Sequence, residues 1–275
     1  MDRAEKAAQN QTSAASRREF LKVSGTLAAG SALTGVAIPH VHAAEDNTIR
    51  LALIGCGGRG SGAAVNAFES PNGPVKLYAM ADLFEKRLQL SHKNLSRLHA
   101  DKIDVPAERQ FLGFDAYKKA IDCLRPGRDV AMLTGYAGFR PMQLEYAVQK
   151  GVHVFMEKSF AVDPPGARRV IQAGEAAAKK NLKIAAGLMC RHSVNRQELM
   201  KRIHDGQLGQ ILLIRAYRMQ GLGAMKPKPA DESELMFQIR NFTKFYWVSG
   251  GLWAEIDIHQ IDQIRWLTDD VYPVT

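Results

Sequence analysis

The sequence predicts an α/β protein whose principal domain is a doubly wound parallel sheet. Between residues 49 and 188, short apolar runs of strand length alternate with longer segments of helical pattern. Such alternation is typical of parallel sheets with helical crossovers. The first apolar run also leads directly into a glycine-rich turn that opens a helix. The 275 residues, 46% of them hydrophobic, are enough for one large or two modest domains.

The first expected element is a short apolar run of the kind that a buried parallel strand requires. A second such run follows the first helix and ends in Ala81-Asp82. The last helix of this domain opens with Pro164-Pro165. The expected strands and helices are, in chain order, Ile49–Ile54, Ser61–Glu69, Val75–Met80, Phe114–Leu124, Asp129–Thr134, Met142–Lys150, His153–Met156, Pro164–Lys180 and Leu182–Leu188.

The turn after the first strand matches the dinucleotide-binding pattern G-x-G-x-x-G. Gly55 allows the tight turn, Gly57 lets the backbone approach a pyrophosphate, and Gly60 permits close packing of helix and strand. Gly58 and Arg59 complete this loop, whose amides at the helix N-terminus can hold an anion. Strand, glycines and helix in this order predict a Rossmann domain that binds NAD or NADP.

Asp82 ends the second strand, 22 residues after Gly60. An acidic residue at this place binds the ribose hydroxyls of NAD. Lys86 and Arg87 follow about one turn later and are able to neutralise a 2′-phosphate, so NADP stays an alternative. A second interpretation makes Asp82 only the N-cap of a helix that starts near Leu83.

The N-terminus has the order of an export signal. A basic segment, Ser16–Lys22, contains the pair Arg17-Arg18 and precedes a weakly apolar run from 23 to 39. Small residues near 41–44 then offer a cleavage site. The twin arginine resembles a Tat signal, so we expect residues 1–44 to engage the Tat export machinery. The protein is then periplasmic, or membrane-associated where the signal is not cleaved; a basic amphipathic helix is the alternative interpretation.

Charge and cysteine content exclude several other classes of protein. The formal net charge is +9, from 37 Lys and Arg against 28 Asp and Glu, which suits an anionic ligand. The basic residues are dispersed and form no arm or stripe, so we do not expect nucleic acid binding. The three cysteines, Cys56, Cys123 and Cys190, are too scattered for a disulfide framework or a zinc site, and we expect no bound metal.

Four segments carry a resemblance to a known family. Glu157-Lys158 ends an apolar strand, and residues 138–141 read Gly-Phe-Arg-Pro. Together with 160–166 and 205–210, these segments resemble the glucose–fructose oxidoreductase/inositol dehydrogenase (Gfo/Idh/MocA) family and its Glu-Lys-Pro signature. The resemblance implies a Rossmann domain at 45–189 and an α+β, mostly antiparallel substrate domain at 190–275. Within the latter we expect a helix at Val194–His204, a strand at Ile211–Met219 and an irregular stretch at 226–229.

The resemblance also implies a function and the residues that perform it. Members of this family use NAD or NADP to oxidise a hydroxyl of a sugar or polyol, so we expect such a substrate, in a homo-oligomer. Lys158 and His259 are the expected catalytic residues, with Glu255 orienting His259 or binding substrate hydroxyls. Thr134 and Glu157 are expected beside the cofactor. An exported member must hold its cofactor tightly, because free nicotinamide cofactor is not expected outside the cytoplasm.

The predicted catalytic stretch has helical spacing. If residues 250–262 are helical, Glu255, His259 and Asp262 stand at i, i+4 and i+7 on one face. A histidine with a pKa near ~6.5 suits proton transfer at neutral pH. The alternative is a core histidine bonded to the backbone between two solvated carboxylates. These three residues lack the further ligand pair that a metal site requires.

Two positions depart from the family pattern. Ser159 follows Glu-Lys where the family has proline, and Gly135 follows Thr134 where the family has proline. Because proline fixes φ, we expect both turns to be loosened. Relatives also continue beyond Thr275, so we expect the second domain to be incomplete. Two alternatives therefore stay open: an NAD-dependent glycosidase of the same superfamily, and a non-catalytic remnant that binds a dinucleotide.

Overall fold

The computed structural model describes residues 46–219, 221 and 223–271. The predicted signal peptide, residues 1–44, lies outside the described residues. From residue 47 on, the described chain belongs to one compact unit. In this part of the chain no helix is both long enough and apolar enough to cross a membrane.

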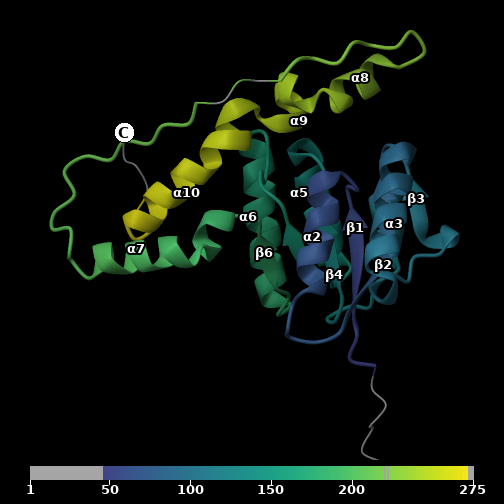
Figure 1. Ribbon diagram of the computed structural model, residues 1–275, viewed down its shortest axis with the longest axis horizontal. Helices are drawn as coiled ribbons and strands as arrows, with labels where there is room; N and C mark the ends of the chain where they lie inside the picture. Colours follow the sequence, from purple (N-terminus) through teal and green to yellow (C-terminus); the bar gives the residue numbers. More distant parts are fainter. Residues whose placement is uncertain (1–45, 220, 222, 272–275) are drawn as a thin grey trace, which may run out of the picture. The chain divides into compact units, whose positions relative to one another are not determined.

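Six parallel strands form a sheet in the order β3-β2-β1-β4-β5-β6 (Figure 1). This is the strand order of dinucleotide-binding doubly wound sheets, in which the order reverses next to β1. The predicted α/β fold class is confirmed. The strands are β1 (Ile49–Ile54), β2 (Val75–Asp82), β3 (Gln110–Leu112), β4 (Val130–Leu133), β5 (His153–Met156) and β6 (Ile184–Ala186).

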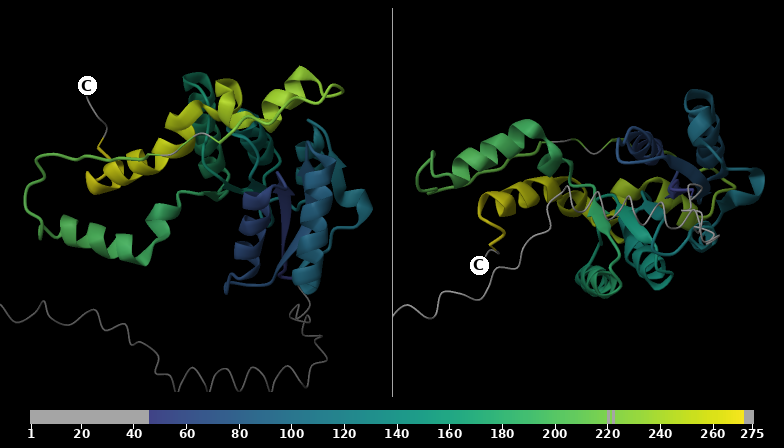
Figure 2. Two further views of the ribbon diagram at one scale, coloured as in Figure 1. Left: turned by 45° about the horizontal axis from the view of Figure 1, so that its top comes forward. Right: turned by 90° about the horizontal axis from the view of Figure 1, so that it is seen from below.

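Helices cover both faces of this sheet. Successive side chains of β1 enter two different buried clusters, with Leu51 and Leu53 in one and Ala52 and Ile54 in the other. Figure 2 (right) shows the purple and blue helices on one side of the sheet and the teal helices on the other. The first group is α2 (Gly58–Phe68) and α3 (Glu85–Leu98). The second group is α4 (Ala116–Asp122), α5 (Arg140–Gln149) and α6 (Pro164–Lys179).

Every strand and helix predicted for this domain is present. The structure adds two elements that the sequence pattern did not predict, the helix α3 and the edge strand β3. Short 3-10 helices occupy the connections at Ala100–Lys102, Ala107–Arg109 and Ala137–Phe139.

After β6 the described chain forms helices and irregular segments. The predicted helix α7 is present with the expected bounds, and residues 226–229 are irregular as predicted. The helical elements are Met189–His192 (3-10), α7 (Val194–His204), α8 (Glu234–Arg240), Phe242–Lys244 (3-10), α9 (Tyr246–Ser249), a π-helical turn at Trp253–Asp257, and α10 (Ile258–Leu267).

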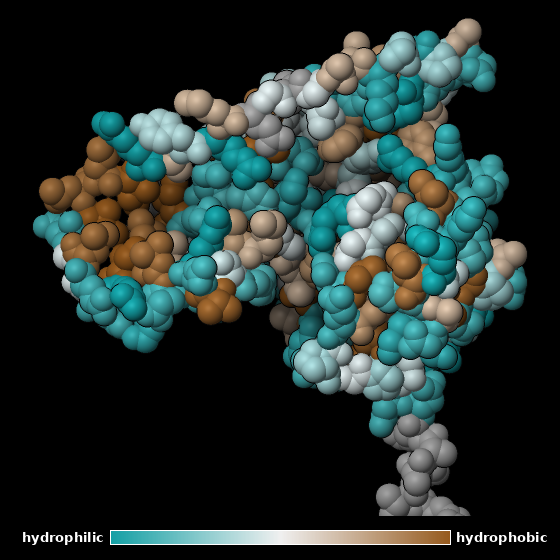
Figure 3. Space-filling model, in the orientation of Figure 1, coloured by the Kyte–Doolittle hydropathy of each residue, from teal (hydrophilic) through white to brown (hydrophobic). Residues whose placement is uncertain are grey.

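The predicted strand at Ile211–Met219 is wrong. These residues have no regular secondary structure, and Leu212 and Met219 are 87% and 93% exposed. A strand is stable only when it is hydrogen bonded to a neighbour, and the described residues after β6 supply no strand to pair with. The expected antiparallel sheet is therefore absent from the described chain. Figure 3 shows hydrophobic surface gathered over α7, α10 and this segment.

Candidate active site

A cleft of about 650 Å³ lies where the loops after β1, β2, β4 and β5 meet. Open α/β sheets bind ligands at this edge, and the volume is typical of a cofactor site. Glu255 lines the cleft as well, whereas His259 does not. All the residues predicted to bind the cofactor line it, namely Gly55, Gly57, Gly58, Arg59, Gly60, Asp82, Thr134, Glu157 and Lys158.

The glycine loop has the backbone geometry that its motif predicts. Gly55 has a φ of +98°, and a Cβ there would lie 2.5 Å from the amide nitrogen of Gly135. A Cβ on Gly60 would lie 2.0 Å from the carbonyl oxygen of Gly55, so this position admits only glycine. Gly57 and Gly58 instead have no atom within 4 Å of a Cβ. Their space opens into the cleft, where a ligand can approach the backbone.

The N-terminus of α2 is available to an anion. Gly57 is the N-cap residue and has no side chain to bond the first-turn amides. No acidic residue lies in the first turn of this helix. The amide groups of a first helical turn have no partner within the helix and carry its positive dipole end. A pyrophosphate fits this donor set.

Asp82 stands beside the glycine loop and is 9% exposed. Its carboxylate accepts hydrogen bonds from the backbone N–H of Cys56 at 2.6 Å and of Phe84 at 2.8 Å. The N-cap residue of α3 is Phe84, so the alternative role of Asp82 as that N-cap is wrong. A carboxylate has about four lone-pair sites, so Asp82 can still accept bonds from ribose hydroxyls.

Lys158 and Glu255 form an ion pair at the same edge. The ammonium nitrogen of Lys158 lies 2.7 Å from Glu255 Oε2 and 2.8 Å from the Glu255 carbonyl oxygen. Both side chains are mostly buried, with 22% and 16% of their surface exposed. A second ion pair joins Arg59 Nε to Glu157 Oε1 at 2.7 Å. The structure therefore brings together two of the three predicted catalytic residues.

Comparison with known proteins finds inositol dehydrogenases among the proteins similar to this chain. No protein-family model matches the chain. The inositol 2-dehydrogenase of Klebsiella pneumoniae (strain 342) is 29% identical over 136 residues, which cover 48% of this chain and 34% of that protein. The inositol 2-dehydrogenase of Acidiphilium cryptum is 21% identical over 82% of this chain and 56% of that protein.

Solved structures share the fold. The myo-inositol 2-dehydrogenase of Lactobacillus plantarum matches with a TM-score of 0.60 and 24% identity, over 80% of this chain and 56% of that one. The scyllo-inositol dehydrogenase of Lactobacillus casei, solved with bound NAD(H) and scyllo-inositol, matches with a TM-score of 0.58 and 24% identity over the same shares. The chain is thus similar to inositol dehydrogenases in sequence and in fold. It spans about half the length of these relatives, or less.

His259 lies in a second, smaller cavity. The cavity measures about 130 Å³ and includes Arg196, Arg218 and Gln263 in its lining. His259 Nδ1 is buried and has no hydrogen-bond partner among the described residues. Burial, followed by the positive charges of Lys158 and Arg218, lowers the pKa of His259 below its ordinary 6.5. The imidazole is consequently neutral at neutral pH, the form that a general base requires.

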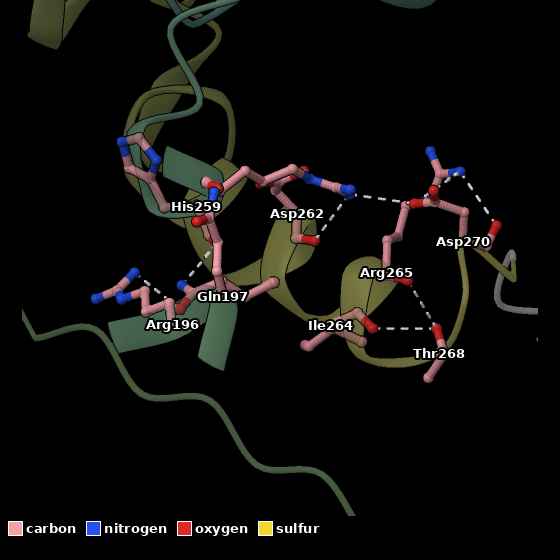
Figure 4. Close-up of polar contacts among 10 residues, drawn as sticks. Arg196, Gln197, His259, Asp262, Ile264, Arg265, Thr268 and Asp270 are labelled. Atoms are coloured by element: carbon pink, nitrogen blue, oxygen red, sulfur yellow. Dashed lines mark hydrogen bonds and ion pairs between the residues drawn. The ribbon is translucent and has the colours of Figure 1, made fainter. Parts of the chain in front are cut away.

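Glu255 and Asp262, the two carboxylates predicted to share a helix face with His259, bind different basic residues. The assumption of one continuous α-helix is wrong, because Glu255 belongs to the π-helical turn that precedes α10. Glu255 binds Lys158, whereas Asp262 accepts a 2.8 Å bond from Arg191. Asp262 and Asp270, both labelled in Figure 4, accept hydrogen bonds from the guanidinium of Arg191. Within the described residues, no three His, Cys, Asp or Glu side chains lie together as metal ligands would.

The turn at Ser159 is held firmly, which corrects the expectation that it is loosened. Ser159 is 1% exposed, and its hydroxyl donates to the carbonyl oxygen of Ala254. Its own carbonyl oxygen accepts a 2.8 Å bond from Arg140 Nε. Hydrogen bonds therefore restrain this backbone where no proline does. No role was predicted for Arg140, although it lies in the Gly-Phe-Arg-Pro segment.

Tyr136 also belongs to the site although no role was predicted for it. It lines the cleft from the turn after β4, and its ring packs on Phe242 with the centroids 4.7 Å apart. Its hydroxyl accepts a hydrogen bond from Arg87, which also lines the cleft. The position of Tyr136, two residues after Thr134 in a predicted cofactor turn, was the available signal.

Proposed function

We propose that this chain forms the cofactor-binding part of an NAD-dependent oxidoreductase that acts on a hydroxyl of a sugar or polyol. The observation that carries the proposal is the cleft, which gathers the glycine loop, Asp82 and the Lys158–Glu255 pair at one edge of the sheet. The relatives named inositol dehydrogenases support a cyclic polyol as the substrate. The NAD(H)-bound relative and the acidic Asp82 support NAD over NADP.

The residues of the cleft fit a dinucleotide in distinct roles. The open N-terminus of α2 would hold the pyrophosphate, and Asp82 would accept bonds from the adenosine ribose. Thr134 and Glu157 would border the other half of the cofactor, since both follow strands on the far side of β1. When bound, the nicotinamide supplies the redox chemistry, because it takes up the hydride from the carbinol carbon.

The side chains at this edge handle the substrate oxygen and its proton. The ammonium of Lys158 can donate a hydrogen bond to the hydroxyl that is oxidised, and Glu255 keeps the ammonium at the cleft. We assign the role of general base to His259, whose neutral imidazole can accept the hydroxyl proton. Lys158 at the cleft and His259 in its own cavity must then both reach one substrate.

Dinucleotide binding is tested by a substitution that the fold tolerates. Gly57→Ala places a methyl group where no protein atom lies within 4 Å, and Gly57 has an ordinary φ of −72°. The variant should therefore fold normally and lose NADH affinity, because the methyl group occupies the approach to the pyrophosphate. Gly62→Ala, in the same helix, is the matched control that should bind NADH as wild type does. Its new Cβ would lie at an ordinary contact distance of 3.6 Å from Arg59 Nη1.

NADH titration by fluorescence quenching on the full chain decides the result. Equal affinities of the Gly57→Ala and Gly62→Ala proteins would reject the proposed site. Reduction of NAD with inositols and with aldoses, followed by absorbance, then tests the reaction. Cleavage of a glycoside without net change in NAD would identify the glycosidase instead. Binding without any turnover would identify the non-catalytic remnant.

We also propose that residues 1–44 direct Tat export and that the exported protein retains its cofactor. The twin arginine Arg17-Arg18 before a weakly apolar run supports this proposal. Replacement of both residues, Arg17→Lys with Arg18→Lys, should keep the chain in the cytoplasm during cell fractionation. Appearance of the doubly substituted chain in the periplasm would reject Tat export. Homo-oligomer formation stays a prediction, which sedimentation of the purified protein tests.

A further inference from the structure

Arg140 is a fully buried cation whose hydrogen-bond partners among the described residues are all main-chain oxygens. It opens α5 and is 1% exposed. Its guanidinium donates to the carbonyl oxygens of Leu133, the last residue of β4, and of Gly135 in the turn that follows. Its Nε donates to the carbonyl oxygen of Ser159 after β5 at 2.8 Å. One side chain therefore ties together the two turns that form adjacent walls of the cleft.

Helix stability does not explain a positive charge at this place. A cation at the N-terminus of α5 opposes the helix dipole, and its burial costs solvation free energy. Burial lowers the pKa of Arg140 to about 10, against the opposing effect of the Glu157 and Glu255 carboxylates. The guanidinium thus stays charged at neutral pH. The hydrogen bonds from Arg140 to the two turns offset the solvation free energy that its burial costs.

Neither turn contains a proline that would restrain its backbone. The Ser159 carbonyl is held by Arg140, and the Ser159 hydroxyl bonds the carbonyl oxygen of Ala254. The next residue along, Glu255, receives the ammonium of Lys158, which itself directly precedes Ser159. Lys158, Ser159, Ala254 and Glu255 thus form a closed circuit of contacts at the edge of the sheet. Arg140 joins this circuit through the Ser159 carbonyl.

We propose that Arg140 is a positioning residue, which fixes the Lys158 ammonium relative to the cofactor wall after β4. Its role in turnover rests on the proposed function, whereas its effect on the position of Lys158 does not. A guanidinium is needed because a planar fork with five donors reaches carbonyl groups on two segments at once. The ammonium of a lysine keeps the charge but cannot span both turns.

The test compares Arg140→Lys and Arg140→Met with the matched control Arg125→Lys. Arg125 also bonds a main-chain oxygen and a buried carboxylate, those of Thr48 and Asp129, but it makes these contacts before β4 and not at the turns after β4 and β5. The first readout is the rate at which trace acetic anhydride acetylates Lys158, mapped by mass spectrometry. It requires neither cofactor nor turnover. The second readout is kcat at saturating NAD, beside the Kd for NADH.

Acetic anhydride should acetylate Lys158 faster in both Arg140 variants than in the wild type, because the Lys158 side chain is released from its fixed place. Their kcat should fall about a hundredfold while the Kd for NADH changes little, since misplacement of a reacting group by about 1 Å has an effect of this size. Arg125→Lys should lower stability and leave both readouts unchanged. Folded Arg140 variants with wild-type acetylation of Lys158 would overturn the proposal.

A second variant covers the case in which neither Arg140 variant folds. Ser159→Ala removes the hydroxyl from the same circuit, and with it the bond to the Ala254 carbonyl oxygen and the 3.5 Å contact with Glu255 Oε1. Faster acetylation of Lys158 in this variant supports the circuit, and an unchanged rate overturns it. A wild-type chain that neither binds NADH nor reduces NAD would reject the proposed function, while the acetylation rates would still decide the role of Arg140.

Discussion

The guanidinium of Arg87 and the hydroxyl of Tyr136 are joined by a hydrogen bond across the cofactor cleft. Arg87 belongs to α3, which follows β2, and Tyr136 follows β4. Because β2 and β4 flank β1 in the sheet, this contact spans the edge where the glycine loop begins. Arg87 also stacks on Phe84 at 4.4 Å, and Tyr136 packs on Phe242. A dinucleotide bound along this edge must pass this Arg87–Tyr136 hydrogen bond, which we call the bridge.

Removal of the bridge should speed the release of NADH. Tyr136→Phe keeps the ring on Phe242 and deletes only the hydroxyl that Arg87 binds. The loss of a hydrogen bond to a charged group should raise the NADH dissociation rate about tenfold, which corresponds to ~1.4 kcal/mol. Stopped-flow displacement of NADH measures this rate. Tyr146→Phe, which deletes a hydroxyl bonded to Asp122 outside the cleft, is the control; equal rates in the two variants would contradict the prediction.

The Lys158–Glu255 pair should matter for turnover more than for cofactor binding. Lys158→Met should reduce kcat by about 10²–10⁴, the range of acid–base groups, with the NADH affinity largely kept. Glu255→Gln should reduce kcat less, because it leaves the carbonyl contact of Lys158 in place. Steady-state rates beside NADH titrations separate the two effects. Lys183→Met, outside the cleft, is the control, and a Lys158→Met protein with wild-type kcat would remove Lys158 from the mechanism.

The pH profile should report the neutral state of His259. Burial first, and then the charges of Lys158 and Arg218, place its pKa below 6.5, so the base form persists below that pH. The acid limb of kcat/KM should therefore have its midpoint below pH 6.5, and His259→Asn should abolish this limb along with most activity. Loss of a nearby positive charge in Lys158→Met should move the residual limb upward. A midpoint at or above 6.5 in wild type would contradict the assignment.

The Rossmann half could be predicted because its signals are local. The apolar run of β1 and the glycine spacing after it each follow from backbone requirements within a few residues. The helix α3 was not predicted, since most of its residues are polar and only Leu88, Ser91 and Leu95 are buried. The strand β3 has three residues and lies at the sheet edge, so it leaves almost no periodic pattern.

The site was predictable in its residues but not in its contacts. Lys158 and Glu255 were both singled out, yet their 97-residue separation gave no sign that they pair directly. The spacing of His259 assumed an α-helix, and the π-helical turn at Trp253–Asp257 changes the direction of Glu255. The prediction of a strand at Ile211–Met219 was wrong for a similar reason. Strand formation depends on a neighbouring strand, which local sequence does not reveal.

The buried carboxylate of Asp129 should make the Rossmann half sensitive to acid. Its side chain is fully buried at the amino edge of β4 and accepts bonds from the Arg125 guanidinium and from the backbone N–H of Arg50. Burial by itself would raise the pKa of Asp129, but these hydrogen bonds outweigh it and lower the pKa below 3.8. The resulting stability is complete above the unfolded value of ~3.9 and is lost as pH falls through the folded pKa.

Urea unfolding at several pH values measures this contribution. Asp129→Asn should lower the free energy of unfolding at pH 7 by about 3 kcal/mol, because it leaves Arg125 beside a neutral group. The variant should also lose the part of the acid dependence that lies below pH ~3.9. Asp115→Asn, which breaks an exposed pair with Lys118, is the control and should cost less than about 1 kcal/mol. Identical pH dependence in Asp129→Asn and wild type would show that the charge of Asp129 does not stabilise this edge of the sheet.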